Sequence, residues 1–184
     1  NSDAIHLLGV IAFQSGRLND AVEMIGLAIG LDSSIPTYHS NYGNALQELK
    51  QFVLAVDSYD KAIHIKPDFI EAYVNRGAAL KELQQLEEAI ASYDIAIELD
   101  PLCSVAYSNR GIALKELRQL DDAAASYEKA ISLNPNYGEA YYNLGITEYE
   151  QKKFDLATAS YIKAITLNPE YSEAYANLGA SFKE

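Results

Sequence analysis

The sequence predicts an all-α protein, a solenoid of about eleven helices arranged in antiparallel pairs. Three observations support this prediction. Glycine and proline recur every 34 residues without insertion, two short helical patterns fit inside each period, and the apolar residues of each pattern fall on one helical face. A unit this small cannot bury its own apolar face, so units of this kind stack on their neighbours.

Five columns of residues carry the 34-residue period along the chain. Their members are Gly9, Gly43, Gly77, Gly111, Gly145 and Gly179; Pro67, Pro101, Pro135 and Pro169; Ala21, Ala55, Ala89, Ala123 and Ala157; Tyr59, Tyr93, Tyr127 and Tyr161; and Ala28, Ala62, Ala96, Ala130 and Ala164. We therefore expect a single domain, 1–184. Its repeats are expected at 2–35, 36–69, 70–103, 104–137 and 138–171, with a partial repeat at 172–184.

Each full repeat is expected to contain two helices joined by a tight turn. In the fourth repeat, apolar and small residues recur at helical spacing over 104–116 and again over 120–133. The Asn-Pro pair at 134–135 ends the second helix, because the residue before proline is pushed out of the helical region. The Gly and Ala columns let two backbones approach closely, and a large Tyr fills the remaining space. The same pattern applies to the other repeats in turn.

The composition excludes several classes of partner. The formal net charge is −12, whereas nucleic acid and anionic membranes are bound by clustered Lys and Arg. The charge either favours basic partners or only keeps the protein soluble. No apolar run approaches the roughly 20 residues of a membrane span, and a cytoplasmic location is favoured. Cys103 is the only cysteine, so no internal disulfide is expected.

The repeats resemble the tetratricopeptide repeat family, whose pattern is Trp-x2-Leu-Gly-x2-Tyr, then Ala-x3-Phe, then Pro, within 34 residues. The corresponding positions of the fourth repeat are Tyr107, Arg110, Gly111, Leu114, Ala123, Tyr127 and Pro135. The first repeat departs most, with Ile5, Ile25 and Ser33 at the first aromatic, second aromatic and Pro positions. The resemblance implies a right-handed superhelical solenoid whose inner groove binds an extended peptide or a partner protein.

A helical wheel identifies the surface that the first helices leave open. Positions 4, 7, 8 and 11 of each repeat form the packing face, and positions 2, 6, 9 and 13 lie opposite. After Leu7, the sixth position is occupied by Asn41, Asn75, Asn109, Asn143 and Asn177. Neighbouring helices lie ~8–10 Å apart and an extended chain advances ~3.3 Å per residue, so each Asn could meet a bound backbone about every third residue. Alternatively, these amides make only local hydrogen bonds.

Two further rows border the asparagines. The thirteenth position reads Gln14, Glu48, Glu82, Glu116, Glu150 and Glu184. This acidic row either attracts basic segments or is a solvated face. The ninth position is mostly apolar, and Tyr142 and Ile146 are expected to form a side-chain pocket. The candidate peptide-binding residues are therefore Asn41, Asn44, Asn75, Asn109, Asn143, Asn177, Tyr142, Ile146, Glu82 and Glu116.

Some members of the family grip a C-terminal carboxylate of heat-shock chaperones with a clamp of Lys, Asn and Arg. Asn44 and Asn75 fit the clamp pattern, but Ser40, Val105 and Asn109 stand where basic residues are needed. The sequence therefore does not predict a chaperone clamp.

No pattern of catalytic or metal-binding residues is found. His6, His39 and His64 lack metal-type spacing, and His39 falls in the aromatic packing column, where it is expected to replace a core residue. Arg76 and Arg110 occupy a position where Leu is usual, and each is expected to pair with an acidic neighbour. No phosphate loop, nucleophile elbow, zinc pattern or dinucleotide fingerprint occurs. The sequence predicts a non-enzyme without a cofactor or metal.

Two alternatives stay open beside the peptide-binding module. The asparagine ladder is similar to that of the superhelices of O-GlcNAc transferases, and the segment 6–12 resembles the starts of bacterial relatives that carry transferase domains. The chain could thus be the substrate-recruiting part of a larger transferase. It could also be a self-assembling scaffold, because 172–184 supplies a first helix without a second. Tyr175, Leu178 and Phe182 would then be partly uncovered, and this helix would contact another copy or continue into a longer parent.

Overall fold

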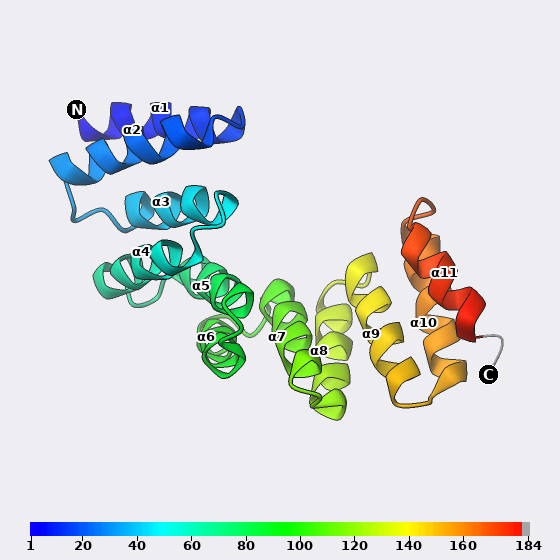
Figure 1. Ribbon diagram of the computed structural model, residues 1–184. Coiled ribbons are helices and arrows are strands. Elements are labelled where there is room, and N and C mark those ends of the chain that lie inside the picture. The colour runs from blue at the N-terminus through cyan, green and yellow to red at the C-terminus, as the bar shows by residue number, and fades with distance from the viewer. Residues whose placement is uncertain (182–184) are drawn as a thin grey trace. The chain divides into compact units, whose positions relative to one another are not determined.

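The computed structural model describes residues 1–181, and in this part of the chain every regular element is an α-helix. Eleven helices are found there (Figure 1): α1 (Ser2–Gln14), α2 (Leu18–Leu31), α3 (Pro36–Glu48), α4 (Phe52–Ile65), α5 (Ile70–Glu82), α6 (Leu86–Leu99), α7 (Ser104–Glu116), α8 (Leu120–Leu133), α9 (Gly138–Glu150), α10 (Phe154–Leu167) and α11 (Ser172–Ser181). The prediction of an all-α chain built of antiparallel helix pairs is confirmed. Phe182 and Glu184 lie outside the described residues.

The helices group into two compact units, Asn1–Leu99 and Asp100–Glu184. The first unit contains the pairs α1/α2, α3/α4 and α5/α6, and the second contains α7/α8, α9/α10 and α11 (Figure 1). Within each unit, the second helix of one pair also packs against the first helix of the next. Every helix except the last thus contacts a partner from its own repeat.

A left-handed residue ends the first helix of each full repeat. Lys50, Gln84, Arg118 and Lys152 have φ between 58° and 63°, and the first repeat places Gly16 here, at φ 73°. The N–H of the following residue reaches back five residues to a helix carbonyl, as in the 3.0 Å bond from Gln85 N to Leu80 O. This is the bond of a Schellman cap. These turns could not be predicted from the sequence, because only one of the five carries the glycine that usually marks a left-handed residue.

The close approach expected of the glycine column is confirmed inside each pair. A Cβ built on Gly43, Gly77, Gly111 or Gly145 would come within 2.5 to 2.7 Å of a ring carbon of the Tyr sixteen residues later. Those tyrosines and the two alanine columns are buried. Gly9 has the same relation to Ile25 in the first repeat. The large ring therefore occupies the space that the missing glycine side chain leaves.

The packing face of the first helices is wider than the helical wheel predicted. From the second repeat on, positions 3 and 10 are also buried, for example Ala72 and Ala79 in α5, whereas Ala4 and Ile11 of the first repeat are exposed. Their small side chains fit because α5 packs on α4 of the preceding repeat as well as on α6. A helical wheel of one repeat accounts for only one packing partner per helix.

Candidate functional site

The candidate site is the set of first-helix faces, α1, α3 and α5 in the first unit and α7, α9 and α11 in the second. Consecutive first helices within each unit contact one another. Position 2 is exposed throughout, as predicted, and positions 6 and 9 are mostly half-buried. Asn143 is only 9% exposed, so position 6 is less open than the wheel predicted.

The asparagine amides connect neighbouring first helices. In the first unit, Asn75 Nδ2 on α5 donates to Asn44 Oδ1 on α3 at 3.0 Å, and Asn41 Nδ2 donates to His6 Nε2 on α1 at 3.0 Å. In the second unit, Asn177 Nδ2 on α11 donates to the Tyr142 hydroxyl on α9 at 3.2 Å. The local hydrogen bonds that the sequence left as an alternative therefore exist for these three asparagines.

Asn44 lies at the centre of this arrangement in the first unit. Its Oδ1 accepts a second hydrogen bond, 2.8 Å long, from the hydroxyl of the buried Tyr59. The hydroxyl also lies 3.2 Å from Gln47 Oε1, and burial raises the pKa of Tyr59. The tyrosine thus stays protonated and fixes the orientation of the Asn44 amide, whose N–H groups are left available on the first-helix face.

His6 completes the row at α1. An amide nitrogen can only donate, so His6 Nε2 accepts from Asn41 and the ring is neutral there. Its ring stacks on Tyr38 with centroids 4.3 Å apart, and the Tyr38 hydroxyl donates to Asp3. Burial lowers the pKa of His6 against the opposing effect of Asp3. Position 5 carries no constant residue type across the repeats, so the sequence gives no signal for this role.

Two hollows lie beside the asparagines. Asn41 and Asn44 border a small one of about 30 Å³ with Val10, Phe13 and Ile25.

A larger hollow in the second unit has a volume of about 170 Å³ and is lined by Ile146, Tyr149, Glu150, Tyr161, Asn177 and Ala180. Ile146 thus lies at a hollow, as the sequence suggested. Tyr142 holds Asn177 through its hydroxyl rather than lining the hollow.

The acidic row is exposed and partly neutralised. Glu82 forms an ion pair with Lys81, and Glu150 forms one with Arg118. Glu116 is exposed. Asn109 is half-buried. Thr147 Oγ1 donates to the backbone carbonyl of Asn143 at 2.8 Å, and within residues 1–181 no hydrogen bond made by the side-chain amide of Asn109 or Asn143 is found.

Arg76 and Arg110 have polar partners, and His39 packs in the core. Arg76 Nε lies 2.6 Å from Asp60 Oδ1, which confirms the predicted acidic partner, and its Nη1 donates to Ser92. Arg110 donates to Ser126. His39 is buried, as expected of a core substitute.

The described residues contain no group of three or more His, Cys, Asp or Glu side chains that could hold a metal ion. Across residues 1–181, no helix has the length and apolar character needed to cross a bilayer.

Comparisons with known proteins agree with this architecture. A model of the tetratricopeptide repeat matches residues 70–102, 104–137 and 138–171, and a second repeat model of the same kind matches residues 43–84. No curated protein matches the sequence.

Several solved structures share the fold. Pseudomonas aeruginosa PilF has a TM-score of 0.87 at 22% identity, covering 99% of this chain and 84% of its own. MamA from Desulfovibrio magneticus RS-1 has a TM-score of 0.83 at 20% identity, covering 93% and 97%. YrrB, described as a TPR protein with an unusual peptide-binding site, has a TM-score of 0.76 at 23% identity, covering 96% and 91%. At these identities the likeness shows the fold.

Proposed function

We propose that this chain, which belongs to the tetratricopeptide repeat family, is a protein–protein interaction module that binds an extended peptide or partner segment along its first-helix faces. The observation that carries the proposal is the fixed amide of Asn44. Because its oxygen accepts from both Tyr59 and Asn75, its N–H groups are oriented before any ligand arrives. Preorganised groups of this kind lose little conformational freedom on binding.

The neighbouring asparagines offer the complementary atoms. Asn41 and Asn75 use Nδ2 in their contacts with the first helix of the preceding repeat, which leaves their Oδ1 atoms to accept from peptide N–H groups. An extended backbone presents donors and acceptors alternately, so this row suits a main chain of varied sequence. The description of YrrB as peptide-binding supports the same type of ligand.

The hollows beside the amides supply places for side chains. The one beside Ile146 has apolar walls and Glu150 at its edge. The net charge of −12 and the exposed Glu82 and Glu116 favour basic peptides.

Binding to a panel of unstructured peptides of varied charge tests the proposal. The intact chain is compared with the triple variant Asn75→Ala, Asn109→Ala, Asn143→Ala, after circular dichroism has shown that the helices remain. The matched control is Asn19→Ala, Asn136→Ala, which removes exposed amides outside the first-helix faces. We expect only the triple variant to lose binding. Unchanged binding by a folded triple variant would place the ligand elsewhere.

The charge preference has its own test. Glu82→Gln and Glu116→Gln should lower the affinity for basic peptides and leave the affinity for neutral peptides unchanged. The transferase and scaffold alternatives stay predictions: a catalytic domain in the full reading frame supports the first, and a mass that rises with concentration supports the second.

A further inference from the structure

Another hollow in the first unit is lined by residues of α2, α3 and α4 and of the turn before α3. Its volume is about 710 Å³, within the range of ligand-binding clefts. The residues that the argument uses are Ile29 from α2, Ser33, His39 from α3, and Asp57, Asp60, Lys61 and Ile65 from α4. The asparagines of the first-helix faces are not among its lining residues, so this hollow is separate from the site proposed above.

The hollow exists because the second repeat lacks the tyrosine that later repeats carry at position 4. Position 4 of the next three repeats is Tyr73, Tyr107 or Tyr141, each half-buried, whereas here it is the shorter His39, which is 6% exposed. The space that a tyrosine occupies in the later repeats is therefore partly vacant in this one.

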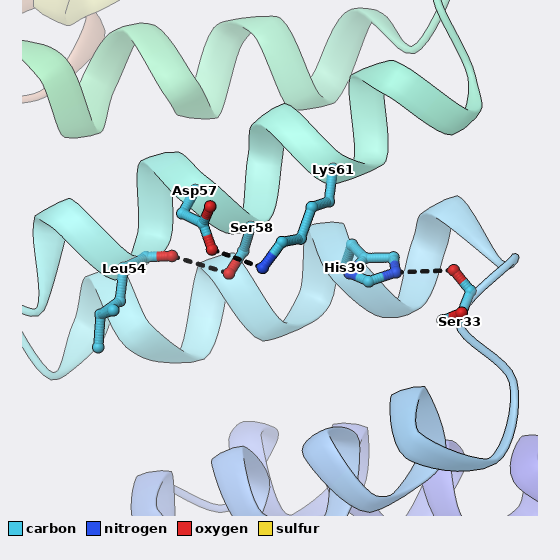
Figure 2. A network of polar contacts seen from close by, with 6 residues as sticks. All are labelled: Ser33, His39, Leu54, Asp57, Ser58 and Lys61. Atoms are coloured by element: carbon cyan, nitrogen blue, oxygen red, sulfur yellow. Dashed lines mark hydrogen bonds and ion pairs between the residues drawn. The ribbon is translucent and has the colours of Figure 1, made fainter.

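The inner wall of the hollow presents hydrogen-bond acceptors. His39 Nε2 lies 2.9 Å from the Ser33 carbonyl oxygen, which can only accept, so Nε2 carries the proton. In the neutral ring Nδ1 is then an acceptor, and Figure 2 shows it on the edge turned toward Lys61 and Asp57. Together with the apolar Ile29 and Ile65, this wall suits a flat apolar group that ends in a donor.

Another repeat shows how a ring is held at this position. In the fifth repeat, Lys163 Nζ lies 6.0 Å from the centroid of the Tyr141 ring, a cation–π distance. Lys61 occupies the same repeat position, and it is held by Asp57 at 2.6 Å instead. The second repeat thus retains the lysine and lacks the aromatic ring.

We propose that this hollow binds a tyrosine side chain of a partner protein. The phenol ring lies between Ile29 and Ile65 below Lys61, and its hydroxyl donates to His39 Nδ1 or to the Asp57 carboxylate. Asp57 and Asp60 place two carboxylates in the lining against the single lysine Lys61, so phosphotyrosine is expected to bind less well than tyrosine. This proposal stands or fails independently of the first-helix site.

Methyl NMR on the intact chain tests the assignment. N-acetyl-tyrosine amide should shift the methyl resonances of Ile29 and Ile65 in a saturable way. N-acetyl-phenylalanine amide should bind about fivefold more weakly, the equivalent of one net hydrogen bond of about 1 kcal/mol. N-acetyl-phosphotyrosine amide should bind less well than the tyrosine probe, and N-acetyl-arginine amide should leave these resonances unshifted.

Two variants and one control test whether the lining of the hollow binds the tyrosine probe. His39→Tyr fills the hollow with the residue that later repeats carry, and it should fold and lose binding. Ile65→Ala removes one apolar wall at a partly exposed position and should weaken binding several-fold. Val53→Ala, on the same helix but 67% exposed and outside the lining, should bind like the original chain.

Each contrary result overturns the proposal. These are equal affinity for the tyrosine and phenylalanine probes, tighter binding of the arginine or phosphotyrosine probe, unchanged binding by His39→Tyr, and an absence of saturable shifts. Should His39→Tyr not fold, unchanged binding by Ile65→Ala would be equally decisive.

Discussion

Gly77 and Tyr93 are in such close contact that a Cβ on residue 77 would lie 2.5 Å from Tyr93 Cε1. The ring is buried, so this pair sets how closely α5 and α6 approach. The equivalent pairs Gly43–Tyr59, Gly111–Tyr127 and Gly145–Tyr161 have the same geometry. One contact, repeated, therefore determines the shape of four helical hairpins.

Gly77→Ala should destabilise the protein by about 1–3 kcal/mol, because the added methyl forces the Tyr93 ring or the backbone to move. Gly30→Ala is the matched control: it also lies inside a helix, but its Cβ would meet nothing within 4 Å. It should stabilise by up to about 1 kcal/mol through helix propensity. Urea unfolding of the two variants measures both effects, and similar free energies of unfolding would contradict the packing argument.

Gln84→Gly should stabilise the protein by about 0.5–1 kcal/mol, since a non-glycine residue at φ 61° is strained. Glycine already occupies the equivalent position in the first repeat, at Gly16. Thermal unfolding measures the change. Gln85→Gly, one residue later and outside the left-handed region, is the control and should not stabilise.

Glu148→Leu should stabilise the second unit near neutral pH. Glu148 is 7% exposed at a position where Leu46, Leu80 and Leu114 stand in earlier repeats. Burial raises its pKa, and its Oε2 accepts from Ser160 at 2.7 Å. A carboxyl with a raised pKa favours the folded state at low pH and loses that contribution as pH rises through the folded pKa.

The leucine variant should therefore gain about 1–2 kcal/mol at pH 7, from apolar burial, and less at pH 4. Ser160 keeps a possible acceptor in the carbonyl four residues earlier, as Ser58 and Ser126 use theirs. Urea unfolding at the two pH values measures the difference. A gain that does not change with pH would show that Glu148 titrates normally.

Lowering the pH should destabilise the first repeat through His6. The folded-state pKa of His6 is lowered, so the unfolded chain binds its proton first and stability falls as pH drops below the unfolded value of about 6.5. Protonation also removes the acceptor that Asn41 uses. Hydrogen exchange of α1 amides at pH 7 and pH 5 measures the loss, after correction for intrinsic exchange rates. His6→Gln, which has no titrating group, should show a smaller pH dependence.

The period, the helix pairs and the glycine–tyrosine contacts could be read from the sequence because each is a short-range pattern repeated in register. The left-handed turns at Lys50 and Gln84 could not, because the residue type there gives no signal and the helix hydrogen bonds impose the conformation. The burial of Ala72 and Ala79 was missed for a different reason: it depends on the preceding repeat, which a single-helix wheel omits.

The candidate site was predictable in part. The sequence placed the asparagines on first helices, but the direction of each amide depends on partners 31 to 35 residues away, such as His6 for Asn41 and Tyr142 for Asn177. The hollow beside His39 was also hidden. The hollow arises because His39 has a shorter ring than the tyrosines at the same position of later repeats. In the sequence this difference is only the replacement of one ring by another.

Asn44 Oδ1 accepts a hydrogen bond that links two repeats, so the rigidity of this link depends on whether a peptide is bound there. The bond from Asn75 holds α5 to α3, so a peptide that competes for this oxygen would release one joint while it fills the surface. A ligand that uses only the free N–H groups would leave that joint closed. The same row of amides can therefore let α3 and α5 move relative to each other when one ligand binds, and hold them together when another binds.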